Sequence, residues 1–103
     1  MKNSDYQMII CIVNEGYSQV VMEAAKEAGA GGGTVIHGRG TANKEAEKMF
    51  GIVIQPDKEI VLIIVKNAIR DKILEAVNKE TGLETAGGGI AFSLPVDRTI
   101  GLS

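Results

Sequence analysis

The sequence contains few of the residues from which common catalytic and binding sites are built. Its 103 residues include no tryptophan, two tyrosines, two phenylalanines, one histidine and one cysteine. So few aromatic rings argue against a stacking platform for single-stranded nucleic acid. The net charge of −2 argues against binding to a phosphate backbone. We therefore expect no nucleic-acid partner.

Long apolar runs and the pattern of a secretory leader are also missing. No unbroken apolar run is longer than that at residues 60–65, which is much shorter than the ~20 residues that cross a bilayer. The first five residues lack the basic region and following apolar stretch of a signal peptide. We expect a cytoplasmic protein that does not insert into a membrane, and its length predicts a single domain over 1–103.

Groups that could perform catalysis are sparse. Cys11 lies between isoleucines and has no second cysteine to pair with, which favours a small buried hydrophobe over a reactive thiol. His37 has neither a second histidine nor an acid at ligand spacing beside it, so no metal site is predicted. We expect a protein that is not an enzyme. The open alternative is a small anion-handling or metal-dependent enzyme that uses His37.

The order of apolar segments predicts the fold class. Short runs rich in Ile and Val favour strands, and apolar residues at helical spacing favour two helices. The predicted strands are 6–13, 34–40, 49–55, 59–65 and 90–94, and the helices are 18–28 and 68–81. We interpret the order as βαββαβ, the α+β ferredoxin-like arrangement with an antiparallel sheet and both helices on one face.

Local signals refine these boundaries. Gly29 and Gly82 follow the two helices, and Asn67 can cap the second one. The sequence Pro56-Asp57-Lys58 is typical of a turn, which predicts a hairpin between 49–55 and 59–65.

The predicted strands are apolar at nearly every position, as in "IICIV" and "IVLIIV". A sheet with one solvated face would alternate apolar and polar residues, so both faces must be covered. No third helix is available for the second face. We expect other copies of the chain to cover it in a closed symmetric oligomer.

Thirteen glycines are the compositional feature that stands out, and they cluster at 29–33, 38–40 and 87–89. Glycine permits positive φ and close approach, and consecutive amides can form a nest for an anion. Arg39 and Arg98 supply positive charge, to which Lys58 or Lys44 can add. The residues alone leave open whether these are site glycines or only turn glycines.

The mixed run "TANKEAEK" at 41–48 has two interpretations as well. Such runs are usually solvated surface. The alternative is a loop that contacts a partner and becomes ordered when a ligand binds.

The last segment, "GGGIAFSLPVDRTIGLS", resembles the carboxy-terminal signature of the PII signal-transduction (nitrogen regulatory protein P-II) family. That signature has a glycine-acid-glycine-lysine turn, a strand, Leu-Pro-Val, an acid and an arginine. The matching residues are Gly87, Gly89, Phe92, Leu94, Pro95, Val96, Asp97 and Arg98. Upstream, "GGTVIHGRG" is similar to the strand that enters the family's long T-loop, with Thr34, Val35 and Gly40 in register.

The resemblance implies a homotrimer whose sheets line a central barrel. It also implies adenine-nucleotide sites (ATP, ADP or AMP) in the clefts between subunits, and regulation of a transporter or metabolic enzyme through the T-loop at 41–48. Such proteins are regulators, not enzymes. The residues expected to contact the ligand are Thr34, His37, Arg39, Gly40, Gly87, Gly88, Gly89 and Arg98.

The chain departs from the family where cations contact the nucleotide phosphates. Ile90 replaces the lysine of the glycine turn, and Gly101 and Ser103 replace two basic residues of the tail. Each lost charge-assisted hydrogen bond is worth about 1.5–3 kcal/mol. The T-loop is short, and Tyr6 and Tyr17 lie outside it, so it offers no tyrosine for nucleotidylation. A divergent PII-like regulator and a scaffold trimer without a ligand are the two interpretations that remain.

Overall fold

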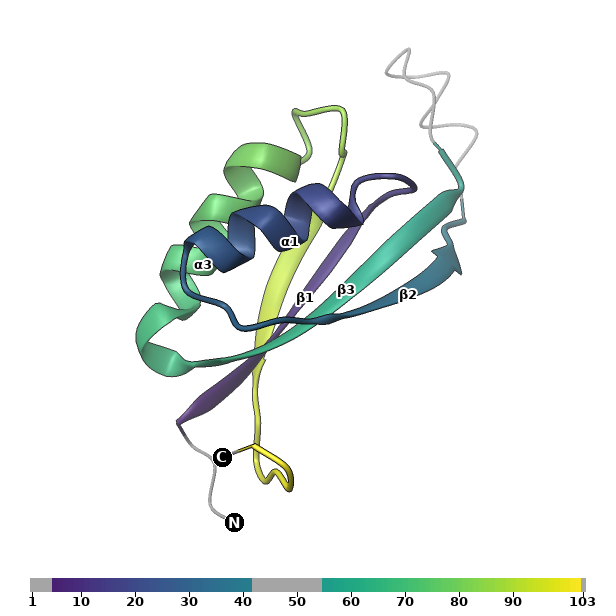
Figure 1. The fold of residues 1–103 in the computed structure, drawn as a ribbon. Helices are drawn as coiled ribbons and strands as arrows, with labels where there is room; N and C mark the ends of the chain where they lie inside the picture. The colour runs from purple at the N-terminus through teal and green to yellow at the C-terminus, as the bar shows by residue number, and fades with distance from the viewer. Residues whose placement is uncertain (1–4, 42–54, 103) are drawn as a thin grey trace.

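The computed structural model describes residues 5–41 and 55–102. Its elements follow the order βαββαβ, as the sequence predicted (Figure 1). They are β1 (Tyr6–Asn14), α1 (Ser18–Glu27), β2 (Thr34–Arg39), β3 (Asp57–Lys66), α3 (Asn67–Thr81) and β4 (Ile90–Pro95).

The strands form one four-stranded antiparallel sheet in the order β2-β3-β1-β4. The register places Ile9 opposite Ile63 across β1 and β3. Both helices pack on the same face of the sheet (Figure 1). The ferredoxin-like α+β fold predicted from the sequence is therefore confirmed.

The predicted hairpin around 56–58 is wrong. Asp57 and Lys58 are the first residues of β3, and Glu59 is paired with Val13 on one side and His37 on the other. Both edges of β3 are occupied there, so no strand ending at residue 55 can pair with it. Because proline lacks an N–H group, Pro56 is as compatible with the position before a strand as with a turn. Residues 49–54 of the predicted hairpin lie outside the described residues.

The helix ends agree with the sequence signals to within one residue. Gly29 follows α1 with φ of 115° and donates its N–H to the Lys26 carbonyl at 3.0 Å, which is the predicted role of a glycine after a helix. Asn67 is the first residue of α3, and Lys66 precedes it. The predicted capping position of Asn67 is therefore wrong by one residue.

The core lies between the helices and one face of the sheet. Alternate residues of β1 and β3 point to that face because side chains alternate along a strand. The core contains Ile9, Cys11, Val13, Val61, Ile63 and Val65 from the strands, with Val21, Ala25, Ile73 and Val77 from the helices.

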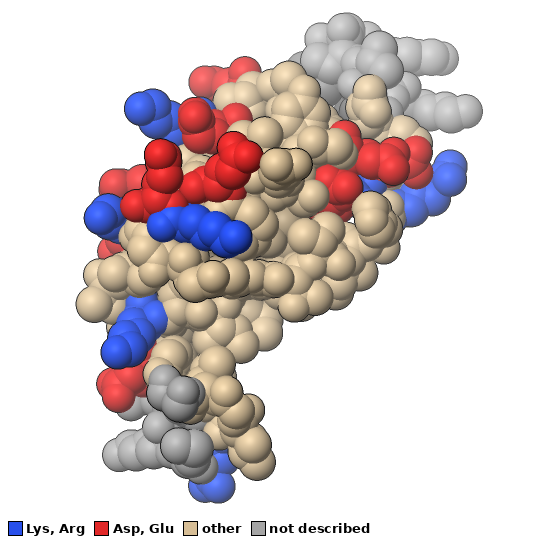
Figure 2. All heavy atoms as spheres, in the orientation of Figure 1, with Lys and Arg blue, Asp and Glu red and all other residues tan. Residues whose placement is uncertain are grey.

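The opposite face of the sheet, here called the open face, is also apolar. Its side chains are half-buried or exposed, with Phe92 at 41% and Leu94 at 49%. The apolar members of the open face are Met8, Ile10, Ile12, Ile36, Ile60, Leu62, Ile64, Ile90, Phe92 and Leu94. The helix side is different, because Lys, Arg, Asp and Glu side chains mix over α1 and α3 (Figure 2). The prediction of a second apolar face is confirmed, and a patch of this extent is typical of an interaction surface.

Cys11 provides a test of the core. It is fully buried, and burial raises the pKa of its thiol to about 11. At pH 8 about a thousandth of such a thiol is ionised, against about a quarter for a free cysteine. Iodoacetamide should therefore label native protein at least about 100-fold more slowly than urea-unfolded protein. Equal labelling rates in the two states would contradict the burial of Cys11.

Candidate functional site

The expected ligand residues lie on both edges of the sheet. His37, Arg39 and Gly40 belong to the β2 edge, and the turn Gly87–Gly89 leads into the β4 edge. The antiparallel register puts Arg39, Gly40 and this turn at the same end of the sheet, which we call the Asn14 end. A single chain therefore brings them to one end but separates them by the width of β3 and β1.

The other two expected residues lie away from the Asn14 end. Thr34 begins β2 opposite Leu62. Arg98 follows β4 and is exposed at the opposite end of the sheet, where Val96 donates its N–H to the Tyr6 carbonyl at 3.1 Å. One chain alone does not bring Arg98 to the glycine turn.

The amides of the glycine turn are already hydrogen-bonded within the chain. Gly87 donates its N–H to the Thr85 hydroxyl at 3.2 Å, and Gly88 donates to the Thr85 carbonyl at 3.0 Å. Gly89 donates to the Thr81 carbonyl at 2.7 Å. An anion could use these donors only after the internal bonds had opened.

Backbone conformation and close packing explain why two of these positions are glycine. Gly88 has φ of 53°, in the left-handed region that favours glycine. A Cβ atom on Gly89 would lie 2.6 Å from the Thr81 carbonyl oxygen and 2.7 Å from Cγ1 of Val13. The turn therefore passes close to the end of α3 and to β1, where larger residues would not fit.

Gly31 and Gly32 are in a different environment. A Cβ atom on either would meet nothing within 4 Å. Together with Thr34 they line a shallow groove on the open face, whose other walls include Met8 and Leu102. Local packing does not explain these two glycines.

A row of side-chain contacts crosses the Asn14 end of the sheet and connects its two edges. The Lys58 ammonium on β3 donates to Oδ1 of Asn14 on β1 at 2.7 Å. Asn14 in turn donates its side-chain amide to the Ala86 carbonyl at 3.1 Å and its N–H to the Gly87 carbonyl at 2.9 Å. On the other side, a Cβ atom on Gly40 would lie 3.3 Å from Cε of Lys58.

Asn14 was missed as a site residue by the sequence reasoning. The available signal was a polar residue at the end of the apolar segment of β1, directly before the break at Gly16. Asn14 can connect Lys58 to the glycine turn only because β1 lies between β3 and β4, which the sequence does not reveal.

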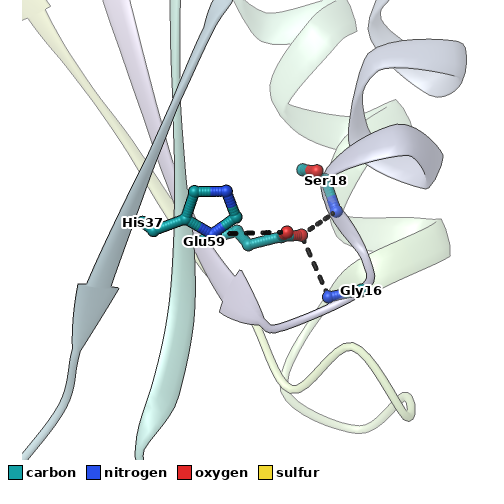
Figure 3. A network of polar contacts seen from close by, with 4 residues as sticks. All are labelled: Gly16, Ser18, His37 and Glu59. Atoms are coloured by element: carbon teal, nitrogen blue, oxygen red, sulfur yellow. Dashed lines mark hydrogen bonds and ion pairs between the residues drawn. The ribbon is translucent and has the colours of Figure 1, made fainter.

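On the helix side of the same sheet end, the Glu59 carboxylate holds the start of α1 (Figure 3). Its Oε1 accepts hydrogen bonds from the N–H groups of Gly16 at 3.0 Å and Ser18 at 2.9 Å. The first N–H groups of a helix lack partners within the helix, so this distant carboxylate takes the place of a local cap. Glu59 thereby connects β3 to α1.

These contacts decide the ionisation of Glu59. The Ser18 N–H lowers the pKa of this carboxyl below the ordinary glutamate value of about 4.3. Burial opposes the decrease, and the N–H of Gly16 and the charge of His37 add to it. The buried group is therefore a carboxylate at neutral pH.

His37 lies against this carboxylate. Its Nδ1 is 3.8 Å from Oε2 of Glu59, and its side chain is 73% exposed (Figure 3). Any positive charge on His37 faces an acid of its own chain. The imidazole is thus better placed to interact with Glu59 than with an anionic ligand.

The remaining candidates are the exposed Arg39, which is opposite Asp57 in the register, and the loop at 41–48. Lys44 and all of the loop except Thr41 lie outside the described residues. Within 5–41 and 55–102, no group of three or more His, Cys, Asp and Glu side chains is arranged to hold a metal ion. No helix in those same ranges is long and apolar enough to span a bilayer.

Comparison with known proteins gives the family. The sequence profile described as "Nitrogen regulatory protein P-II" matches residues 6–103, and the chain belongs to this family. No curated relative matches the sequence. The resemblance of the carboxy-terminal segment is thereby confirmed for nearly the whole chain.

Solved structures share the fold at low sequence identity. PII of Arabidopsis thaliana, crystallised with citrate, is 23% identical with a TM-score of 0.69, covering 92% of this chain and 78% of its own. A PII-like signaling protein of Thermus thermophilus is 19% identical with a TM-score of 0.69, covering 93% and 90%. A functionally unknown protein of Pediococcus pentosaceus is 15% identical with a TM-score of 0.68, covering 96% and 99%.

The Glu59 contacts predict a pH-dependent stability. Because the pKa of Glu59 is lowered on folding, its contribution is complete well above pH 4.3 and is lost as the pH falls through the folded pKa. Glu59→Gln should lower the free energy of unfolding at pH 7 by on the order of 1 kcal/mol, as loss of a helix cap does. The deficit should shrink below about pH 4.

Urea unfolding at pH 7 and pH 3.5 measures both effects. Glu84→Gln is the control, because Glu84 is exposed and lies outside the contacts of α1. A Glu59→Gln deficit of the same size at both pH values would contradict the role given to the charge.

Proposed function

We propose that this chain is a homotrimeric, cytoplasmic P-II-type regulator rather than an enzyme. It binds a small anionic metabolite between subunits and acts on a partner protein through the segment 41–48. The observation that carries the proposal is the apolar open face together with a candidate site divided between the two edges of one sheet. Family membership supports a regulatory role, with control of a transporter or metabolic enzyme in nitrogen metabolism as the expected output.

Assembly would both cover the apolar open face and bring together the two halves of the candidate site. The largest exposed apolar side chains of the β4 edge, Phe92 and Leu94, lie on the open face and would be covered by neighbouring copies. In a closed ring, the β2 edge of one copy approaches the β4 edge of the next. His37, Arg39 and Gly40 of one subunit then face Gly87–Gly89 of another.

The ligand is proposed to be a small organic anion. The adenine nucleotides ATP, ADP and AMP follow from the family, and the citrate in the Arabidopsis PII structure adds a polycarboxylate to the candidates. Because Ile90, Gly101 and Ser103 stand where family cations contact phosphates, nucleotides should bind weakly.

A scaffold trimer without a ligand is the second candidate. It is favoured by the internal hydrogen bonds of the glycine-turn amides, which leave these donors occupied. In this case the partner would recognise the assembly alone.

Replacing Phe92 by glutamate tests the assembly. A charge on the open face would be buried without a partner at the interface, so Phe92→Glu should convert a trimer into a monomer. Leu83→Glu is the control, because Leu83 is 71% exposed in the loop after α3 and lies off the open face. Size-exclusion chromatography with light scattering measures the masses, and a wild-type chain that runs as a monomer would overturn the proposal.

Calorimetric titration tests the ligand. ATP, ADP, AMP, citrate and bicarbonate are each titrated into the wild-type trimer. At least one should bind more tightly than about 1 mM, which is about −4 kcal/mol. Absence of binding by all five would favour the scaffold trimer.

A further inference from the structure

All polar groups of Thr85 form hydrogen bonds within the turn that leads from α3 into β4. Its N–H and its hydroxyl both donate to the Gly82 carbonyl, at 3.0 Å and 2.8 Å. Its hydroxyl oxygen accepts the N–H of Gly87 at 3.2 Å, and its carbonyl accepts the N–H of Gly88 at 3.0 Å. One half-buried residue therefore occupies two of the three N–H donors of Gly87–Gly89.

The two bonds to Thr85 differ in what is needed to open them. The bond from Gly88 joins two backbone groups, so it opens only when the backbone of the turn changes. The bond from Gly87 reaches a hydroxyl, which leaves when the Thr85 side chain turns from one staggered rotamer to another. The Gly82 carbonyl would still accept the Thr85 N–H after this rotation. The hydroxyl is thus a contact with two discrete arrangements.

Asn14 holds the other side of the same turn. It donates its side-chain amide to the Ala86 carbonyl at 3.1 Å and its N–H to the Gly87 carbonyl at 2.9 Å. A Cβ atom on Gly88 would lie 2.8 Å from Nδ2 of Asn14, so the turn also packs closely on this side chain. These contacts do not involve the Thr85 hydroxyl. Rotation of Thr85 would therefore leave the Gly87 N–H in place and without an acceptor.

There is room beside Thr85 for a rotated side chain and a ligand. Thr85 and Gly89 line a hollow of about 610 Å³ at the end of α3. Its wall contains one cation and one anion, Lys79 and Glu84, so its charge does not by itself select an anion. Access to the backbone donors of the turn then decides whether an anion can bind here.

The Thr85 hydroxyl occupies the position that a ligand oxygen would take. A charged oxygen accepts a stronger hydrogen bond than a neutral hydroxyl does, and an N–H group without an acceptor is costly. We infer that Thr85 is an autoinhibitory latch: its hydroxyl keeps the glycine turn closed, and an anionic oxygen reaches the Gly87 N–H only after Thr85 has rotated away. The inference rests on the proposed function, since it assigns the residue that limits access of the proposed ligand to this turn.

Amide hydrogen exchange measured by NMR tests the latch without any ligand. Thr85→Val keeps the shape of the side chain but removes the hydroxyl, and Thr85→Ser is the matched control that retains it. Exchange at Gly87 should be at least about tenfold faster in Thr85→Val than in wild type, with smaller changes at Gly88 and Gly89. Thr85→Ser should keep most of the protection of Gly87.

Two exchange results would overturn the inference. The first is equal exchange at Gly87 in wild type and Thr85→Val, which would mean that the hydroxyl protects nothing. The second is equal acceleration at Gly87, Gly88 and Gly89, which would mean that the hydroxyl supports the whole turn and is not a latch.

Titration with inorganic phosphate, followed by the amide resonance of Gly87, tests the inhibitory role. Removing a competing acceptor increases the fraction of turns that can bind, so Thr85→Val should bind phosphate at least about threefold more tightly than wild type. Thr85→Ser should bind like wild type. A purely structural role for Thr85 predicts the opposite, which is weaker binding by the valine variant. Unchanged or weaker binding by Thr85→Val, or no binding by any of the three proteins, would overturn the inference.

The five anions named above separate this inference from the proposed function. If wild type binds one of them and Thr85→Val binds it no more tightly, the inference is overturned and the proposed function stands. If wild type binds none of the five while Thr85→Val binds phosphate at Gly87, the ligand claim for the wild-type trimer is removed and the latch is supported.

Discussion

The structure depends on one constraint, which is that a four-stranded sheet apolar on both faces has helices on only one. The helices bury Ile9, Ile63 and their neighbours, and this packing forms the core of the chain. The second face keeps Phe92 and Leu94 partly exposed to water. Folding of one chain therefore leaves a large apolar surface, and covering this surface would contribute stability through the hydrophobic effect. The surface that the proposed assembly would cover therefore arises from the composition of the strands rather than from any special interface motif.

Strand β3 contributes side chains both to the two apolar faces of the sheet and to the candidate site. Its consecutive residues Lys58 and Glu59 point to opposite faces at the Asn14 end. Glu59 points to the helices and accepts hydrogen bonds from the N–H groups of Gly16, before α1, and Ser18, its first residue, which satisfies an acid at the edge of the core. Lys58 points to the open face and donates to Asn14, the last residue of β1, which is itself bonded to the turn before β4. The alternation of side chains along one strand thus places an acid against the start of α1 and a lysine on the open face.

The sequence predicted the elements better than their pairing. Apolar periodicity located both helices and the strands at 6–13, 34–40 and 90–94, because burial of one face leaves a local pattern. It misassigned the segment around Pro56, because a proline before a strand and a proline in a turn look alike. The contacts of Lys58 with Asn14 and of Glu59 with Ser18 join residues 44 and 41 positions apart, and only the register creates them.

The glycine turn shows most clearly what the sequence leaves undecided. Three consecutive glycines are compatible with an anion-binding nest, yet they are also what a chain needs when it passes close to another backbone. Gly89 lies against the Thr81 carbonyl, and all three N–H groups of the turn have internal acceptors. The turn therefore contributes shape rather than donors. Since an anion requires compensating positive charge, a site beside the turn would depend on side chains rather than on these amides.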